Sequence, residues 1–206
     1  DDGRPVVNTR RLLEALEQAP KLGMVVTAHC EDLYLAAGGL MNEGEVSQRL
    51  GVPGIPAAAE DCGTAREIAA AASIGAPIHI CHVSTKGSVA LIRDAKARGV
   101  QVTAETCPHY LLLTEEALEG RDADYRMNPP LRTEEDRLAL IQGLKDGTLD
   151  AIATDHAPHS PEEKADFLKA PNGSIGMETS LAATLTALEG ELSLAQVVEK
   201  MSCNPA

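Results

Sequence analysis

Apolar positions along the chain follow two alternating patterns. Short runs of mostly apolar residues, which are typical of buried strands, cover residues 23–29, 78–82, 100–106 and 149–155. Helical spacing of apolar residues predicts helices over residues 9–18, 60–74, 86–98, 133–145, 178–188 and 194–201. Gly99 and Gly147 follow two of these helices where glycine commonly ends a helix, and Thr133 is placed to cap another. Strands and helices that alternate at this spacing predict parallel βαβ units with right-handed crossovers.

Polar residues at the strand ends distinguish between the two folds that such units build. His29, His82 and Asp155 each stand at the carboxyl end of a predicted strand, and Asp2 would end a strand that lies upstream. A ring of polar residues from several strand ends is typical of (β/α)₈ TIM-type barrels. No glycine-rich phosphate loop follows a strand, which argues against a doubly wound nucleotide-binding sheet. We therefore predict an α/β fold in which residues 1–206 form about the second half of a barrel, strands 5–8 with their helices, truncated on the N-terminal side.

Composition narrows the class of protein. The 206 residues are 44% hydrophobic but only 2% aromatic, so we expect a core of Ala, Leu, Ile and Val. A net charge of −13 argues against a nucleic-acid partner, because such binding depends on neutralising phosphates. No apolar run reaches bilayer length, and the start of the chain shows no signal peptide. Five cysteines without a Cys-x-x-Cys pair predict no disulfide framework, so we expect a cytoplasmic location.

The strand-end residues also suggest a chemistry. Neutral imidazole nitrogens and carboxylate oxygens, held in fixed directions by separate strands, suit a zinc ion. We therefore interpret His29, His82 and Asp155 as metal ligands, with His156 as the alternative to Asp155. Glu105 lies near the end of the third predicted strand. It is either a partner that orients a metal-bound histidine or a buried carboxylate without a chemical task.

Alternation along a strand predicts which side chains share a face with these candidates. Successive side chains point to opposite faces, so one inward residue fixes the orientation of its neighbours. If His82 faces the barrel axis, Ile78 and Ile80 face it as well. His79 and Cys81 would then pack against the helices, so we expect them to be structural residues.

Five motifs occur in order along the chain. They are His29-Cys30-Glu31-Asp32, Ile80-Cys81-His82-Val83-Ser84, Glu105-Thr106-Cys107-Pro108-His109-Tyr110, Met127-Asn128-Pro129-Pro130-Leu131-Arg132 and Thr154-Asp155-His156-Ala157-Pro158-His159. Any one motif is shared with hydantoinases and allantoinases, but the last two in combination are much more specific. With these motifs the chain closely resembles the bacterial class I dihydroorotases of the amidohydrolase superfamily, over essentially its whole length.

The resemblance implies a reaction and a set of metal ligands. The reaction is the zinc-dependent, reversible cyclisation of N-carbamoyl-L-aspartate to (S)-dihydroorotate in pyrimidine biosynthesis. The resemblance implies two Zn²⁺ ions per active site of the intact enzyme, bridged by Asp2. It further implies that His29 and His82 hold one ion, and that Asp155 ligates the other and acts as the catalytic acid and base.

The resemblance also implies substrate contacts and a missing part. Asn128 and His159 correspond to substrate-contacting residues, and Asn172 and Gly173 lie in a turn that resembles the loop closing on the pyrimidine ring. The family's His-x-His pair, an arginine that grips the substrate carboxylate and a further substrate asparagine lie upstream of Asp1. We therefore expect the chain to be incomplete and inactive alone.

Two other functions remain open. One is another cyclic amidohydrolase, a dihydropyrimidinase (hydantoinase) or allantoinase, although those relatives use a carboxylated lysine where this chain offers Asp2. The other is a non-catalytic barrel that acts as a scaffold for aspartate transcarbamoylase. A small-molecule substrate is expected in the catalytic case, with a homodimer or aspartate transcarbamoylase as candidate protein partners. Neither nucleic acid nor a membrane is an expected partner.

Overall fold

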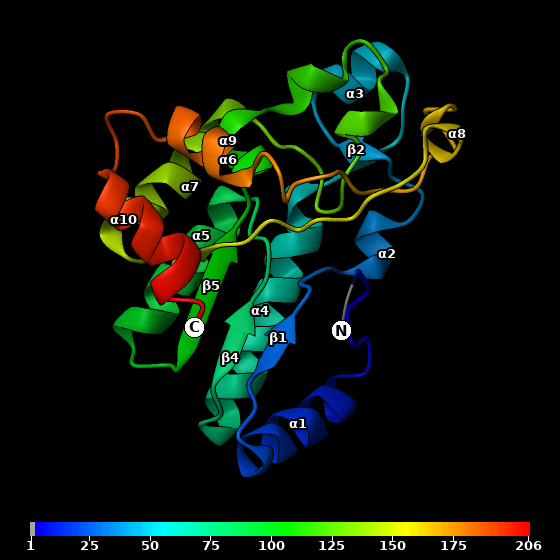
Figure 1. Cartoon of the computed structure of the whole chain (residues 1–206). Helices are drawn as coiled ribbons and strands as arrows, with labels where there is room; N and C mark the ends of the chain where they lie inside the picture. The colour runs from blue at the N-terminus through cyan, green and yellow to red at the C-terminus, as the bar shows by residue number, and fades with distance from the viewer. Residues whose placement is uncertain (1–2) are drawn as a thin grey trace.

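A four-stranded parallel sheet organises residues 3–206, the part of the chain that this computed structural model describes (Figure 1). Its strands, in spatial order, are β1 (Val26–Ala28), β4 (Ile78–Ile80), β5 (Val102–Thr106) and β6 (Ala151–Ile152). Ala28 pairs with Ile80, and Ile80 pairs with Ala104. A separate parallel ribbon joins β2 (Met41–Asn42) to β3 (Gly54–Ile55). The order of the main sheet follows the chain, as successive βα units require.

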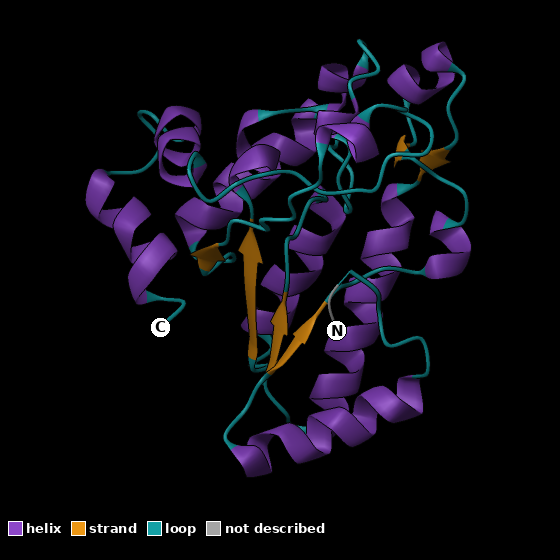
Figure 2. Cartoon of the chain, turned by 45° about the vertical axis from the view of Figure 1, so that its right-hand side comes forward, coloured by secondary structure: helices purple, strands orange, loops and turns teal. Residues whose placement is uncertain are grey.

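Helices join the strands, and several of them cover one side of the sheet. They are α1 (Thr9–Gln18), α2 (Leu33–Ala36), α3 (Glu45–Leu50), α4 (Ala57–Ile74), α5 (Lys86–Ala97), α6 (Pro108–Leu112), α7 (Glu134–Asp146), α8 (Pro161–Lys164), α9 (Ser180–Ala187) and α10 (Leu194–Val198). Short 3₁₀ turns lie at η1 (Ala19–Leu22), η2 (Glu115–Leu118) and η3 (Ala123–Tyr125), and a π-helical turn, η4 (Glu199–Cys203), follows α10. Figure 2 shows β1, β4 and β5 side by side, with helices behind them.

The predicted alternation of strands and helices is confirmed, with the ends shifted by a few residues. The helix α1 has the predicted bounds, and α7 begins after a capping box in which Thr133 and Asp136 bond each other's backbone N–H. Gly147 ends α7 with a φ of 81°, in the left-handed region that glycine enters without strain. The ribbon of β2 and β3, and helices α2, α3 and α6, were not predicted, because they are too short to show a period.

Burial shows which face of the sheet meets the helices. Ile78 and Ile80 on β4 are both 1% exposed and belong to the main core, together with Ile92 of α5. His79 and Cys81 lie on the other face, where they line a hollow with residues of β1, β5 and β6. The prediction that these two residues pack against the helices is therefore wrong.

The error has a local cause in the backbone. His82 has a φ of 36°, which lies in the left-handed region and interrupts the alternation beyond the end of β4. Counting back from His82 by strict alternation therefore assigns the residues of β4 to the wrong faces of the sheet. None of the helices within residues 3–206 combines the length and the apolar character needed to cross a membrane.

Candidate active site

Two buried imidazoles meet where β1 and β4 end. His29 directly follows β1, and its Nδ1 lies 2.9 Å from Nε2 of His82. The rings meet edge to face, with 4.7 Å between their centroids. His29 is 1% exposed and His82 is 9% exposed, so both imidazoles are buried. Only one of the two facing nitrogens can carry the shared proton, and the other must offer its lone pair.

The backbone is strained at two of the residues predicted from the sequence. His82 has a φ of 36° and Asp155 a φ of 47°, and neither is a glycine. Such conformations cost of order 1–3 kcal/mol each and tend to cluster at functional sites, where surrounding contacts hold them. The strain is consistent with surrounding contacts that hold the backbone, so that these two side chains keep fixed directions.

Burial keeps two histidines neutral. Burial, and to a lesser extent the neighbouring His29, lowers the pKa of His82 to about 3. Burial alone lowers the pKa of His109, at the start of α6, to about 3. A neutral imidazole offers a lone pair, which is the form that binds a metal ion.

These pKa values predict that the metal-free protein loses stability in mild acid. Both histidines bind a proton near pH 6.5 when unfolded but only near pH 3 when folded, so the stabilisation present above pH 6.5 is lost as the pH falls. Between pH 7 and pH 5 each should cost about 2 kcal/mol of unfolding free energy. Urea titrations with a chelator present at both pH values measure this, and His109→Phe should remove about half of the effect. An unchanged pH dependence in His109→Phe would contradict the assignment.

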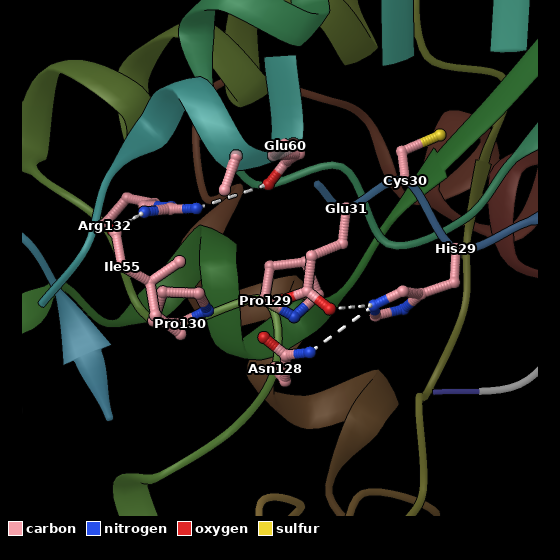
Figure 3. Close-up of a pocket in the computed structure, with 10 residues that line it drawn as sticks. His29, Cys30, Glu31, Ile55, Glu60, Asn128, Pro129, Pro130 and Arg132 are labelled. Carbon is pink, nitrogen blue, oxygen red and sulfur yellow. Dashed lines mark hydrogen bonds and ion pairs between the residues drawn. The ribbon is translucent and has the colours of Figure 1, made fainter. Parts of the chain in front are cut away.

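A small polar pocket adjoins His29 (Figure 3). Nε2 of His29 lies 3.3 Å from Oε2 of Glu31 and 3.4 Å from Nδ2 of Asn128. Burial raises the pKa of Glu31, but its hydrogen bond to His29 and the attraction of that imidazole outweigh burial, so the pKa lies below its usual value. Oδ1 of Asn128 is buried without a hydrogen-bond partner in the described part of the chain. An unpaired buried acceptor next to an imidazole is the kind of group that a polar ligand would satisfy.

A buried ion pair that lines this pocket ties its loops together. Glu60 on α4 accepts hydrogen bonds from the backbone N–H groups of Ser84 and Thr85 at 2.9 and 3.1 Å. Arg132 lies 3.8 Å from Glu60, and its Nη1 donates to the backbone oxygen of Ile55 at 2.8 Å. The loop after His82 and the loop after Asn128 are therefore held by one buried carboxylate and one buried guanidinium.

The loops after β6 bring three predicted substrate contacts together. His159 Nε2 lies 2.9 Å from the backbone oxygen of Asn172, and the N–H of Gly173 donates to the backbone oxygen of Arg126 at 2.9 Å. Arg126 also donates to Oδ1 of Asn172 at 3.1 Å. His156, the alternative to Asp155, accepts a hydrogen bond from the N–H of Gly176 at 3.0 Å. This bond engages the Nδ1 of His156 in holding the loop.

Of the remaining predicted residues, one is outside the described residues and two lie near other side chains. Asp2 is outside them. Asp155 has a carboxylate oxygen within 4.8 Å of donor atoms of Cys107 and His109. Glu105 lies 3.3 Å from Nε2 of His79, so its histidine partner is on the open face of the sheet.

Sequence reasoning singled out neither Glu31 nor the pair of Glu60 and Arg132 as parts of the site. Glu31 stands in the motif after β1 and Arg132 ends the Asn-Pro-Pro-Leu-Arg motif, so both gave a signal. Glu60 gave none, because a glutamate in the first turn of a helix is ordinary.

Several observations show that these residues fit a metal ion. His29 and His82 place two ring nitrogens 2.9 Å apart, buried and with the pKa of His82 far below neutral pH. Nε2 of His109 is buried without a hydrogen-bond partner among residues 3–206, and Asp155 lies next to it. Imidazole nitrogen and carboxylate oxygen are ordinary zinc ligands. The donor set therefore fits zinc, with His29 and His82 as the best-formed part.

Comparison with known sequences supports the resemblance seen in the motifs. A family model described as dihydro-orotase-like matches residues 1–88. The chain is 55% identical to a dihydroorotase of Geobacter metallireducens and 56% identical to one of Desulforapulum autotrophicum, in each case over the whole chain. The resemblance to dihydroorotases is thereby confirmed. The chain spans about half the length of these curated relatives, 49% of each.

Solved structures confirm the fold. A D-hydantoinase structure matches 99% of this chain with a TM-score of 0.81 and 33% identity, and the match covers 47% of that protein. An L-hydantoinase (dihydropyrimidinase) from Arthrobacter aurescens matches 97% of this chain with a TM-score of 0.83 and 29% identity, over 46% of its own length. The predicted α/β fold, part of a TIM-type barrel, is confirmed.

Proposed function

We propose that this chain, which is similar to dihydroorotases over its whole length, is the C-terminal part of the catalytic barrel of a dihydroorotase. The intact protein would interconvert N-carbamoyl-L-aspartate and (S)-dihydroorotate in pyrimidine biosynthesis. The observation that carries the proposal is the buried contact between His29 and His82 at the ends of neighbouring strands. This contact lies in a chain that is 55% identical to a dihydroorotase.

The metal centre would be held by residues from several strand ends. His29 and His82 would hold one of two zinc ions and Asp155 the other, with Asp2 as the bridge. Zinc, when bound, lowers the pKa of water and polarises a carbonyl group. Glu31 accepts a hydrogen bond from His29 at 3.3 Å when that nitrogen is protonated, and so helps to set the tautomer of the ring.

Asp155 would move the proton in both directions. In hydrolysis it takes a proton from the attacking water as the new C–O bond forms at the ring carbonyl. It then gives that proton to the amide nitrogen as the C–N bond breaks, and ring closure reverses the same steps. Its backbone just after β6 is held in a strained conformation, with a φ of 47°, and this keeps the carboxylate pointing in one direction.

Substrate would lie between the histidine pair and the loops after β6. Asn128 is next to His29 and has a buried, unpaired Oδ1 that can accept a hydrogen bond from an N–H of the substrate. His159, Asn172 and Gly173 lie together on the neighbouring loops and would close over the ring. Each supplies polar groups that suit an amide and a carboxylate.

Assays on the intact protein test the substrate. Dihydroorotate, hydantoin and allantoin are compared side by side, at equal enzyme and zinc concentrations. Dihydroorotate should be hydrolysed with much the highest kcat/KM. Preference for hydantoin would favour the alternative, a dihydropyrimidinase (hydantoinase). The 33% identity to a D-hydantoinase structure is consistent with that alternative. No turnover and no bound zinc would favour the scaffold for aspartate transcarbamoylase.

Location and partners form part of the same proposal. All five cysteines are free thiols in the structure, which is consistent with a reducing cytoplasm. A homodimer and an assembly with aspartate transcarbamoylase are the candidate complexes. Size measurement of the intact protein with and without aspartate transcarbamoylase distinguishes them.

Replacing either histidine of the pair should remove zinc. In the intact protein His29→Ala or His82→Ala should lose about one equivalent of zinc and most of the activity, because each supplies one of few bonds to the ion. Metal analysis and turnover are measured together. His156→Ala is the matched control, since its Nδ1 is engaged in the loop after β6, and it should keep its zinc. Full zinc content in His82→Ala would contradict the assignment.

A further inference from the structure

A second group of metal-binding side chains lies on the open face of the sheet, apart from the histidine pair. We propose that His79, Cys81 and Glu105 form a further site for a divalent cation of the zinc type. One ligand atom from each of the three lies within 4.8 Å of the others. None of the three is among the residues that the proposed function uses as ligands, so this site is independent of it.

The two strands fix the directions of the three side chains. His79 and Cys81 are two positions apart on and just after β4, so they project from the same face. Glu105 is on β5, where the register pairs His79 with Thr103 and Ile80 with Ala104. Continuing that register by one residue places Glu105 beside Cys81. Neighbouring strands lie about 4.8 Å apart, which allows side chains on one face to converge on a single ion.

The hydrogen bonds of His79 orient its ring towards this point. Its Nδ1 lies 2.8 Å from the hydroxyl oxygen of Thr103, and its Nε2 lies 3.3 Å from Oε2 of Glu105. When Nδ1–H donates to Thr103, Nε2 carries a lone pair that faces a carboxylate oxygen. In the other tautomer Nε2–H donates to Glu105 and Nδ1 accepts from the hydroxyl of Thr103, so a bound cation would take the place of the proton between imidazole and carboxylate.

The three side chains are half-buried. They line the hollow on the open face with Val25, Thr27 and Ala151, which a closed barrel would cover. His79 and Glu105 have side chains that are 19% and 20% exposed, so they are neither sealed in the core nor fully solvated. Asp150 also borders the hollow, but Lys96 already pairs with it at 2.7 Å. In a closed barrel this face turns inward, beneath the strand ends.

The donor set selects the class of metal. One imidazole nitrogen, one sulfur and one carboxylate oxygen suit zinc and its analogues, whereas magnesium and calcium prefer oxygen ligands alone. A thiolate and a carboxylate together carry two negative charges, which match a divalent ion. A fourth ligand, from water or from another part of the barrel, would complete a tetrahedral set.

Cobalt reports on this site because a bond to sulfur gives a charge-transfer absorption that histidine and carboxylate ligands do not give. The intact protein is refolded in Co²⁺ after removal of its metal, and its near-ultraviolet spectrum is recorded. The wild type should show a sulfur-to-cobalt band, and Cys81→Ser should lose it. His79→Gln and Glu105→Gln should each weaken cobalt binding at this band at least about tenfold.

Matched variants separate this site from the other thiols and from the catalytic centre. Cys62→Ser, Cys30→Ser and Cys107→Ser should keep the band, and so should His82→Ala, which removes a ligand of the proposed catalytic pair. The proposal is overturned if the wild type shows no such band or if Cys81→Ser retains it. Loss of the band in Cys107→Ser alone would place the cobalt next to Asp155 instead. If Cys81→Ser does not fold, the histidine and glutamate variants decide the outcome.

Discussion

Arg132→Met should destabilise the protein by about 3–5 kcal/mol, because it leaves the buried carboxylate of Glu60 without its cation. The side chains of Arg132 and Glu60 are 2% and 4% exposed, so water cannot replace the lost partner. Burial already raises the pKa of Glu60 despite the attraction of Arg132 and its hydrogen bonds to Ser84 and Thr85. Removing the guanidinium removes the largest of the effects that oppose burial. Urea unfolding at neutral pH measures the loss.

A surface arginine provides the matched control. Arg93 pairs with Asp146 at 2.8 Å, but their side chains are 45% and 32% exposed. Arg93→Met should therefore change stability by at most about 1 kcal/mol. A double-mutant cycle with Glu60→Gln isolates the buried pair, and the combined variant should lose less than the sum of the single losses. Strict additivity would show that the two side chains do not act as a pair.

The same substitution should also affect the proposed metal centre, through the loop after β4. Ser84 and Thr85 bond to Glu60 and stand two and three residues after His82. Loosening that loop frees the strained backbone of His82, with its φ of 36°, to relax. Zinc content should fall in Arg132→Met even at temperatures where the protein remains folded. Retained zinc under those conditions would limit the pair to a role in stability.

The sequence was most informative where a physical period or a strand end was present. The helices α1, α5 and α7 have long amphipathic or capped patterns, and their positions were predicted to within a few residues. His29 and His82 were predicted to ligate one metal ion from neighbouring strand ends, and the structure places their ring nitrogens 2.9 Å apart. Metal binding by either residue remains a proposal.

The sequence was uninformative where the chain departs from regular geometry. Alternation gave the wrong face for His79 and Cys81, because the left-handed backbone at His82 reverses the parity after β4. Such a backbone is rare for histidine and depends on tertiary contacts, so no local pattern announces it. The buried pair of Glu60 and Arg132 joins residues 72 positions apart (132 − 60) and is likewise visible only in three dimensions.

Asp155→Asn should lower the rates of hydrolysis and ring closure together, by roughly 10²–10⁴-fold in the intact protein. An amide cannot take the proton of the attacking water, and it cannot return one to the departing nitrogen. In the proposed mechanism one group serves both directions, so both rates must fall. Because Asn keeps the size of Asp, the fold and the ion held by His29 and His82 should remain. Zinc analysis and both rates are therefore measured on the same preparation.

The pH profiles of the wild type provide a second measurement for Asp155. Hydrolysis requires an ionised carboxylate and should decline as the pH falls, whereas ring closure requires the protonated form and should decline as the pH rises. In Asp155→Asn the residual rates should lose both of these dependences. Near-normal rates in both directions would remove Asp155 from the mechanism. His156 or His159 would then be the next candidate, since both follow Asp155 in the loop after β6.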